Sequence, residues 1–288
     1  AVVWSAIFNF LAAVLLGTGV AAMVGRGMVE LSLVNERVIV AGILGAIIWD
    51  LLTWWVALPT SSTHALLGGY AGAAIAAAGW GVIIARGWIL TLAFVVISPA
   101  VGLVLAWGFM ILASWTFRRS HPRKVDQTFR RLQLVSAAML SLAHGTNDAQ
   151  KTMGIVTTAL VAGHFIPTFQ VPLWVVLMAA VAMGLGTMSG GWRIVHTMGA
   201  RITKLKPVGG SCAEFASAIA LFGSTALGIP VSTTHTVTGA IVGVGSVERM
   251  SAVRWGIARN IVWAWILTIP AAAVVAAGCW WVLGPVLH

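Results

Sequence analysis

Long apolar stretches alternate with short polar segments along this chain. Five of the stretches are close to or above the roughly 20 residues that an α-helix needs to cross a bilayer. They cover residues 1–24, 38–58, 88–117, 171–189 and 255–284. Two shorter apolar segments are 62–79 and 230–246. Each begins within, or at the start of, a polar motif whose first residue is proline. The pattern predicts an all-α protein with many membrane-spanning helices.

The chain contains the same polar motif twice. PTSSTH at 59–64 and PVSTTH at 230–235 share the pattern P-x-S-[ST]-T-H and lie 171 residues apart. The register continues without a gap, because Pro99 and Pro270 correspond at the same offset. Duplicated membrane segments are typical of secondary transporters, whose substrate site lies between the two repeats. We therefore expect two inverted repeats.

The duplication divides the chain into a first repeat (1–116), a basic linker (117–132) and a second repeat (133–288). Short segments interrupted by glycine or proline, at matching positions of two repeats, are typical of broken helices near the midplane of a transporter. Non-helical backbone at that depth must be buried in protein or line a wet cavity. We therefore expect the two proline-led motifs to face each other near the midplane of a polytopic membrane protein.

Composition and charge support a membrane protein. Hydrophobic residues make up 59% of the chain and charged residues 8%, whereas soluble domains contain roughly 25% charged residues. The net charge of +10 is concentrated in short segments between apolar stretches, with six basic residues between 118 and 131. This distribution is typical of cytoplasmic loops, and no soluble basic domain is present to bind nucleic acid. Cys212 and Cys279 lie in apolar stretches and indicate neither a disulfide nor a metal site.

Each proline-led motif places three hydroxyl groups in one helical turn. Proline suits the first turn of a helix, because it lacks the N–H group that would be unsatisfied there. A helix that begins at the motif directs free N–H groups and a partial positive charge into the protein, which favours an anion. The candidate anion-binding residues are Ser61, Ser62, Thr63, Ser232, Thr233 and Thr234. The alternative is that these hydroxyls bond to their own helix or mediate helix packing.

A second polar cluster, HGTNDAQKTMG at 144–154, interrupts an apolar stretch. Its charged side chains cannot face lipid, because a charge at the bilayer centre costs at least about 2.5–3.5 kcal/mol. Asn147 and Asp148 offer oxygen ligands that suit a sodium ion, Asp148 is also a proton acceptor, and Gly145 permits an unwound backbone. A self-neutralising pair of Asp148 and Lys151, one turn apart, is the structural alternative. The accessory candidates are His144, Gln150 and Lys151.

HGTNDAQKTMG, PVSTTH and PTSSTH together resemble the signatures of the inorganic phosphate transporter family, in particular its compact bacterial members. The resemblance covers essentially the whole chain. It implies an inverted-repeat fold, a central phosphate held by the hydroxyl turns and Asn147, and coupling to sodium or protons without a cofactor. Asn147 and Asp148 match the signature pair, with sodium at Asp148. The repeat offset places an earlier copy of this signature about 27 residues before Ala1, so we expect a further membrane segment upstream.

Other polar residues in apolar surroundings are weaker candidates. Glu214 is an acid within an apolar helix that can join a cation site, a role that the resemblance also suggests. Asp50 has no acidic counterpart in the second repeat, and we expect it to be paired within the bundle. His64 and His235 follow the hydroxyl triplets. Either could sense protonation, but we expect each to serve as a structural residue held by hydrogen bonds.

The sequence therefore predicts cation-coupled uptake of inorganic phosphate across a bacterial inner membrane, by a multi-pass protein of the lipid bilayer that can form homo-oligomers. Sulfate transport on the same scaffold stays open. Phosphate near neutral pH retains a proton and gains from an acceptor such as Asp148, whereas sulfate only accepts hydrogen bonds. A membrane hydrolase that uses Ser189 of GTMSGG is the remote alternative, and it leaves the duplication unexplained. We expect a transporter and not an enzyme.

Overall fold

Helices account for nearly all of the regular structure. The computed structural model describes residues 1–15 and 17–285. Within those residues, the one strand-like feature is an isolated bridge between Val29 and Ile83, which confirms the all-α prediction. The α-helices are α1 (Val2–Leu15), α2 (Gly19–Arg26), α3 (Glu36–Trp55), α4 (Ser62–Ala78), α5 (Ala85–Thr116), α6 (Pro122–Ala162), α7 (Leu173–Ser189), α8 (Trp192–His196), α9 (Pro207–Ala226), α10 (Thr233–Glu248) and α11 (Trp255–Val282). Short helical turns are η1 (Leu31–Leu33), η2 (Trp80–Val82), η3 (Thr197–Arg201) and η4 (Met250–Ala252).

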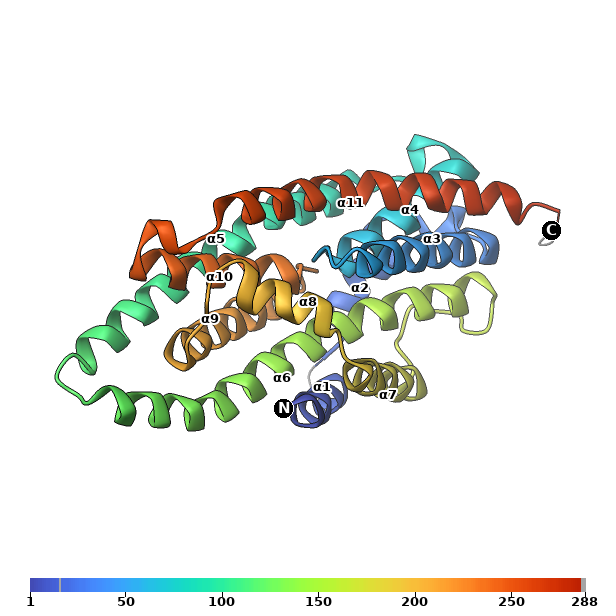
Figure 1. Ribbon diagram of the computed structural model, residues 1–288. Helices are drawn as coiled ribbons and strands as arrows, with labels where there is room; N and C mark the ends of the chain where they lie inside the picture. Colours follow the sequence, from blue (N-terminus) through green and yellow to red (C-terminus); the bar gives the residue numbers. More distant parts are fainter. Residues whose placement is uncertain (16, 286–288) are drawn as a thin grey trace.

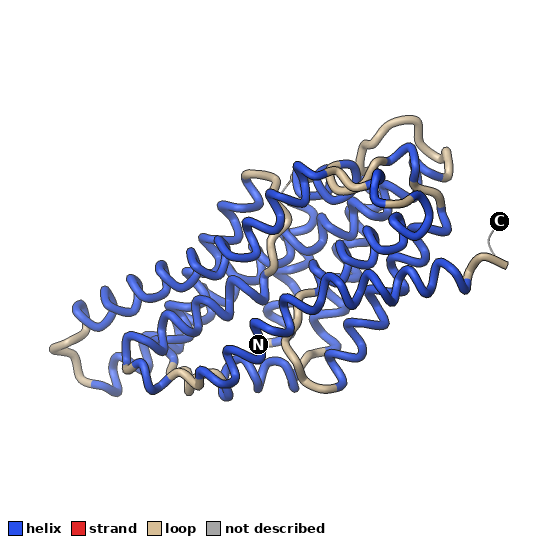
Figure 2. Tube along the Cα trace, turned by 90° about the horizontal axis from the view of Figure 1, so that it is seen from above, coloured by secondary structure: helices blue, strands red, loops and turns tan. Residues whose placement is uncertain are grey.

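The length and surface of the helices identify a polytopic membrane protein. By length and composition, α3, α5 and α11 can each cross a membrane, and the number rises to five if each of two bent helix pairs is one span. Large hydrophobic side chains such as Val96 of α5 and Val274 of α11 are exposed, and a bilayer would cover them. The helices lie side by side in an elongated bundle, with most loops at its ends (Figure 2).

The helices of the two halves correspond in order, α1–α5 to α7–α11. α3 and α9 are offset by 171 residues at both ends, and α4 and α10 begin at the same offset. α5 and α11 each contain an internal proline, Pro99 and Pro270. The pair α1–α2 and the pair formed by α7 with α8 and η3 are both bent by more than 40°. Within the described part of the first half, α6 has no counterpart.

Helices of the two halves pack against each other reciprocally. α4 packs against α11, and α10 packs against α5. Gly68 of α4 touches the backbone of Ile269 so closely that a Cβ there would lie 2.5 Å from the Ile269 carbonyl oxygen. Gly239, at the same position of α10, lies against the Pro99 carbonyl. This exchange of partners is what a two-fold relation between the halves requires. Figure 1 shows α5 and α11 running in opposite directions along the bundle.

The polar cluster at 144–154, where Gly145 suggested an unwound backbone, is a regular part of α6. α6 runs without a break from Pro122 to Ala162 and also includes most of the basic segment 117–132. The expectation that Gly145 unwinds the backbone is therefore wrong. Gly145 instead admits α1, because a Cβ at this position would lie 2.5 Å from the Asn9 carbonyl oxygen.

Gly145→Ala is therefore expected to lower the thermal unfolding midpoint, because overpacking a close helix contact typically costs about 1–3 kcal/mol. Gly186→Ala in α7 is the matched control, since nothing lies within 4 Å of a Cβ placed there. The control is expected to leave the midpoint unchanged or to raise it slightly, because alanine favours a helix over glycine. Equal midpoints for both variants in detergent would contradict the packing role of Gly145.

Candidate functional site

The two hydroxyl motifs form the starts of α4 and α10. Ser61 is the N-cap of α4, and its hydroxyl oxygen accepts a hydrogen bond from the His64 backbone N–H at 3.2 Å. Ser232 caps α10 through the His235 N–H at the same distance. An N-cap serine satisfies one of the free N–H groups of the first turn. Both caps are buried, so the first hydroxyl of each motif stabilises its own helix.

The starts of α4 and α10 lie next to each other. The rings of His64 and His235 meet edge to face, with centroids 4.5 Å apart. The Thr63 hydroxyl donates to the Val231 carbonyl at 3.3 Å. Segments separated by more than 160 residues thus meet, as the spacing of the motifs predicted. Two helix N-termini, each carrying a partial positive charge, converge on the same part of the protein.

Lys151 of α6 connects the two motifs. Its ammonium group donates to the Thr63 hydroxyl at 2.5 Å and to the Val231 carbonyl at 2.7 Å. It also forms an ion pair with Asp148 Oδ1 at 2.6 Å. The Lys151 side chain is only 3% exposed. A buried ammonium is costly unless it is paired and hydrogen-bonded, and these three partners meet that requirement.

Asp148 lies among donors from two helices. Its Oδ2 is 3.0 Å from His144 Nε2 and accepts a hydrogen bond from the Thr233 hydroxyl at 3.3 Å. Asp148 therefore contacts the second hydroxyl motif directly and the first one through Lys151. The ion pair that the sequence offered as an alternative is present, but it is part of a larger network that joins α6 to both motifs.

Asn147 does not share this network, although it is adjacent to Asp148 in the chain. Its side-chain amide donates to the Thr225 hydroxyl of α9 at 2.9 Å, and the residue is fully buried. Its carbonyl oxygen Oδ1 has no hydrogen-bond partner among the described residues. Successive residues of an α-helix point about 100° apart because 3.6 residues make one turn. Asn147 and Asp148 therefore face different neighbours.

Asn9 of α1 belongs to the network and was missed by the sequence analysis. Its Oδ1 lies 2.9 Å from His144 Nδ1, and its Nδ2 donates to the Thr187 hydroxyl of α7 at 3.2 Å. Both ring nitrogens of His144 thus have a side-chain oxygen within hydrogen-bonding distance, Asn9 Oδ1 and Asp148 Oδ2. Asn9 thereby orients His144 toward Asp148. A single asparagine within an apolar stretch was the signal that could have identified it.

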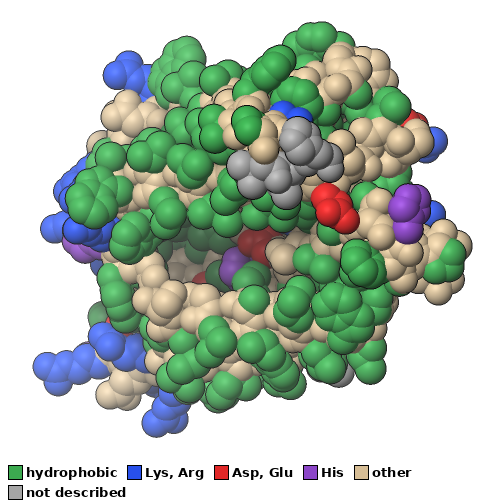
Figure 3. Space-filling view, turned by 90° about the vertical axis from the view of Figure 1, so that its right-hand side faces the viewer, with side chains coloured by type: hydrophobic (Ala, Val, Ile, Leu, Met, Phe, Trp, Pro, Cys, Tyr) green, Lys and Arg blue, Asp and Glu red, His purple; other side chains and the backbone are tan. Residues whose placement is uncertain are grey.

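A cavity of about 360 Å³ lies beside this network. Its polar lining comes from α4 and α6, and its apolar lining comes mainly from α7. Figure 3 shows a hollow with acidic and histidine side chains inside it, on a face otherwise rich in hydrophobic residues. The cavity offers one carboxylate, one ammonium group and several hydroxyls, a set that can hold an anion and a cation together. The polar lining residues are Ser62, Thr63, His144, Asp148, Lys151 and Thr152.

Three further candidates, not yet placed, also lie outside the cavity lining. Gln150 accepts a hydrogen bond from the Val20 N–H, at the start of α2, at 2.8 Å. Glu214 of α9 accepts a hydrogen bond from Ser136 at 2.5 Å. Ser136 precedes Asp148 by twelve residues of α6, or about 18 Å at 1.5 Å per residue, so Glu214 and Asp148 are not ligands of one ion. Thr234 is half-buried and follows Thr233 on α10.

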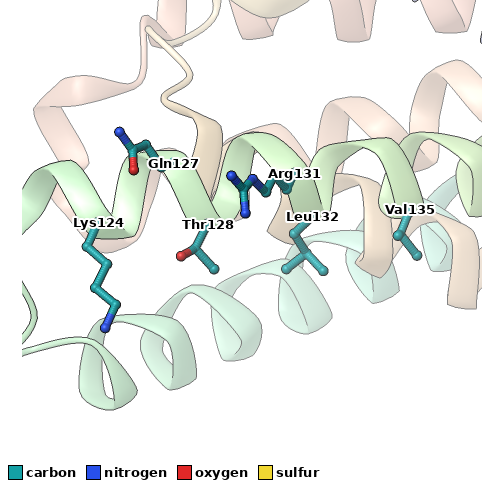
Figure 4. A pocket seen from close by; sticks show the side chains of 6 residues that line it. All are labelled: Lys124, Gln127, Thr128, Arg131, Leu132 and Val135. Carbon is teal, nitrogen blue, oxygen red and sulfur yellow. The ribbon is translucent and has the colours of Figure 1, made fainter.

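A second, basic groove lies on the outer face of α6, far from the network. Its volume is about 540 Å³, and Figure 4 shows that its lining side chains all come from one stretch of α6. Arg131 is separated from Asp148 by 17 residues of this helix, or about 25 Å. Neither hydroxyl motif contributes to the groove. The lining residues are Lys124, Gln127, Thr128, Arg131, Leu132 and Val135.

Comparison with known proteins agrees with this arrangement. The model of the phosphate transporter family matches residues 1–276. A protein of Rhizobium meliloti named "probable low-affinity inorganic phosphate transporter" is 52% identical over 281 residues, which cover 97% of this chain and 84% of that protein. A protein of Bacillus subtilis with the same name is 40% identical over 286 residues, covering 98% and 86%.

A solved structure titled "The sodium-dependent phosphate transporter" has the same fold. Its TM-score is 0.91 at 24% identity, with 99% of this chain and 90% of that chain covered. The remote alternative of a membrane hydrolase is thereby excluded, since the family and its members are transporters. The chain therefore belongs to the phosphate transporter family, and it is a membrane transporter rather than an enzyme.

Proposed function

We propose that the protein carries inorganic phosphate across the membrane that encloses the cytoplasm, together with a cation. The observation that carries this proposal is the convergence of Lys151, Asp148 and the two hydroxyl motifs beside one cavity. Membership of the phosphate transporter family supports the choice of substrate. The structure favours no second function, and sulfate enters as a competitor in the test.

Phosphate binding is assigned to Lys151 and to the hydroxyls of Ser62, Thr63 and Thr233. A phosphate oxygen in the cavity would take the ammonium group of Lys151 and the Thr63 hydroxyl as donors, in place of the contacts that they make with each other. Hydrogen bonds between charged groups are shorter and about twice as strong as neutral ones. The N-termini of α4 and α10 add a favourable potential.

Cation coupling is assigned to Asp148. In the present structure its charge is balanced by Lys151, and its Oδ2 lies 3.0 Å from His144 Nε2. When Lys151 turns to phosphate, Asp148 loses part of that balance, and an isolated buried carboxylate is costly. A sodium ion or a proton at Asp148 restores the balance. Binding of the anion and of the cation therefore favour each other, which is the thermodynamic basis of symport.

Alternating access is assigned to the two halves of the bundle. The matched helix bounds, the reciprocal packing of α4 with α11 and of α10 with α5, and the opposite directions of α5 and α11 support an inverted repeat. Inverted repeats that move against each other around a midplane site expose it to each side in turn. The basic end of the bundle, at the α5–α6 turn, is expected to face the cytoplasm.

The function is tested by uptake of radiolabelled phosphate into vesicles that contain the purified protein. Sodium and proton gradients are imposed separately, and sulfate is added as a competitor. Phosphate accumulation that requires one of the two gradients and resists excess sulfate is the expected result. Accumulation without either gradient would contradict coupling, and equal competition by sulfate would contradict the proton-accepting role of Asp148.

Thr63→Val is expected to weaken phosphate binding while the cation dependence of the remaining uptake is kept. The change removes one hydroxyl and nearly preserves the shape of the side chain. Losing a hydrogen bond to a charged ligand costs roughly 1.5–3 kcal/mol, or about tenfold to a hundredfold in affinity. Phosphate saturation curves measure the effect, with Thr233→Val expected to act in the same direction.

Thr116→Val is the matched control for Thr63→Val. Thr116 is exposed at the end of α5 and donates only to the Leu112 carbonyl of its own helix among the described residues. The half-saturating phosphate concentration of this control is expected to equal that of the wild type. If Thr63→Val also kept wild-type affinity, the hydroxyl motifs would serve helix packing and not the substrate.

A further inference from the structure

The two hydroxyl motifs continue into a second repeated pattern. His64 is followed by Gly68 and Gly72, and His235 is followed by Gly239 and Gly243, with a spacing of four residues in each case. A spacing of four places each set on one face of its helix. That face packs against the proline-containing helix of the other repeat, α11 for α4 and α5 for α10.

The glycines define the register of these contacts. A Cβ on Gly239 would meet the Pro99 carbonyl, and one on Gly243 would meet the Leu103 carbonyl. One turn earlier on both helices, His235 lies beside the backbone of Val95. Three successive turns of α10 thus follow three successive turns of α5 at the same step of four residues.

The other repeat shows the same four-residue step, shifted by one residue relative to its proline. Gly68 and Gly72 of α4 lie against the backbone of Ile269 and Ala273 in α11. One turn earlier, His64 lies beside the backbone of Trp265. The proline of α11, Pro270, directly follows the Ile269 contact. Val95 precedes Pro99 by four residues, whereas Trp265 precedes Pro270 by five, so of these two carbonyls only that of Val95 is left without a helical N–H by its proline.

The Val95 carbonyl has a special need for a donor. In an α-helix, the carbonyl of residue 95 accepts from the N–H of residue 99, and Pro99 has no N–H group. Buried carbonyls are normally paired. His235 is fully buried, and neither of its ring nitrogens makes a well-aligned hydrogen bond with a described residue. A free carbonyl and a free donor therefore lie side by side, and a small change in the bend of α5 would align them.

The histidine rings are also packed against each other and against an indole. The indole of Trp265 stacks on His235 with centroids 3.8 Å apart, and the ring of His64 meets His235 edge to face with centroids 4.5 Å apart. The backbone N–H of each histidine bonds to the N-cap serine of its hydroxyl motif at 3.2 Å. Movement of a ring therefore moves the turn that carries the anion-binding hydroxyls.

We propose that His235 is a positioning residue, whose ring donates a hydrogen bond across the repeat boundary to the Val95 carbonyl at the proline break of α5 when the bend of α5 brings the two into line. This bond couples the bend of α5 to the geometry of the hydroxyl turns. The inference rests on the proposed phosphate transport, because the hydroxyl turns matter only if they hold the substrate.

The test compares two substitutions of His235 in the protein reconstituted in vesicles. His235→Phe keeps a ring but removes the donor, whereas His235→Gln keeps an N–H donor and removes the ring. Loss of the bond is expected to raise the half-saturating phosphate concentration roughly threefold to tenfold in the phenylalanine variant. The glutamine variant is expected to stay within about twofold of the wild type. His196→Phe, at an exposed position, is the matched control.

A double-mutant cycle with Pro99 identifies the acceptor. The substitution Pro99→Ala supplies the backbone N–H that the Val95 carbonyl lacks, so this N–H competes with His235 for the carbonyl. His235→Phe is then expected to cause no further loss of affinity in the Pro99→Ala background.

Two results would overturn the proposal. One is equal loss of affinity from His235→Phe with and without Pro99→Ala, which would show that the two residues act independently. The other is normal phosphate affinity in the phenylalanine variant with a defect in the glutamine variant, which would assign the histidine to packing alone. Absence of phosphate uptake by the wild-type protein would instead refute the proposed function, so the two failures are distinguishable.

Discussion

Lys151→Met is expected to abolish phosphate uptake. The substitution removes the ammonium group that bonds to Thr63, to Val231 and to Asp148. The substrate loses the buried cation of the site, and affinity is expected to fall at least a hundredfold, because two or more charged hydrogen bonds at roughly 1.5–3 kcal/mol each are lost. Radiolabelled phosphate binding to the purified protein measures the loss.

Folding must be separated from binding in this variant. Removing one partner of a buried ion pair costs about 3–5 kcal/mol, because the other charge is left uncompensated. The double variant Lys151→Met with Asp148→Asn removes both charges and is expected to recover folded protein without recovering phosphate binding. Lys204→Met, on an exposed loop, is the matched control. Wild-type phosphate affinity in folded Lys151→Met protein would refute the assignment of Lys151.

Asp148→Asn is expected to reduce uptake at least a hundredfold while phosphate still binds. The change preserves the size of the side chain and a hydrogen-bonding oxygen, but it removes the charge that attracts a sodium ion or a proton. The anion pocket, formed by Lys151 and the hydroxyl turns, keeps its shape. Uptake that remains is expected to respond weakly to the sodium and proton gradients. Transport under imposed gradients, measured beside equilibrium phosphate binding, separates the two effects.

Asp126→Asn is the control for the loss of a carboxylate. Asp126 pairs with Arg130 at the exposed N-terminal part of α6, at 2.7 Å, and exposed pairs contribute little. This variant is expected to transport phosphate like the wild type. If Asp148→Asn kept full gradient dependence, the coupling cation would bind elsewhere. The next group to test would be Asn147 Oδ1, which has no hydrogen-bond partner among the described residues.

The sequence predicted the parts of the fold that depend on local patterns. The fixed offset of the two proline-led motifs anticipated the matching starts of α4 and α10 and the prolines inside α5 and α11. Polar residues within an apolar stretch predicted that Asp148 and Lys151 lie inside the protein rather than facing lipid. These predictions succeeded because helix starts and the cost of burying charge are encoded in neighbouring residues.

Other features depend on contacts between distant segments and were not predicted. The spacing of Asp148 and Lys151 indicated a local pair, but it gave no sign that Lys151 also reaches Thr63 and Val231 across the bundle. Gly145 suggested an unwound backbone, whereas its role is the close approach of α1. Adjacent residues suggested one site for Asn147 and Asp148, although helix geometry directs Asn147 toward α9.

The central claim is that one network binds the anion through Lys151 and the cation through Asp148. Phosphate binding by wild-type and Asp148→Asn protein, titrated at a series of sodium concentrations and pH values, tests it most directly. Wild-type affinity is expected to rise with the concentration of the coupling cation, and the variant is expected to bind phosphate with an affinity independent of both cations. Equal cation dependence in the two proteins would contradict the claim.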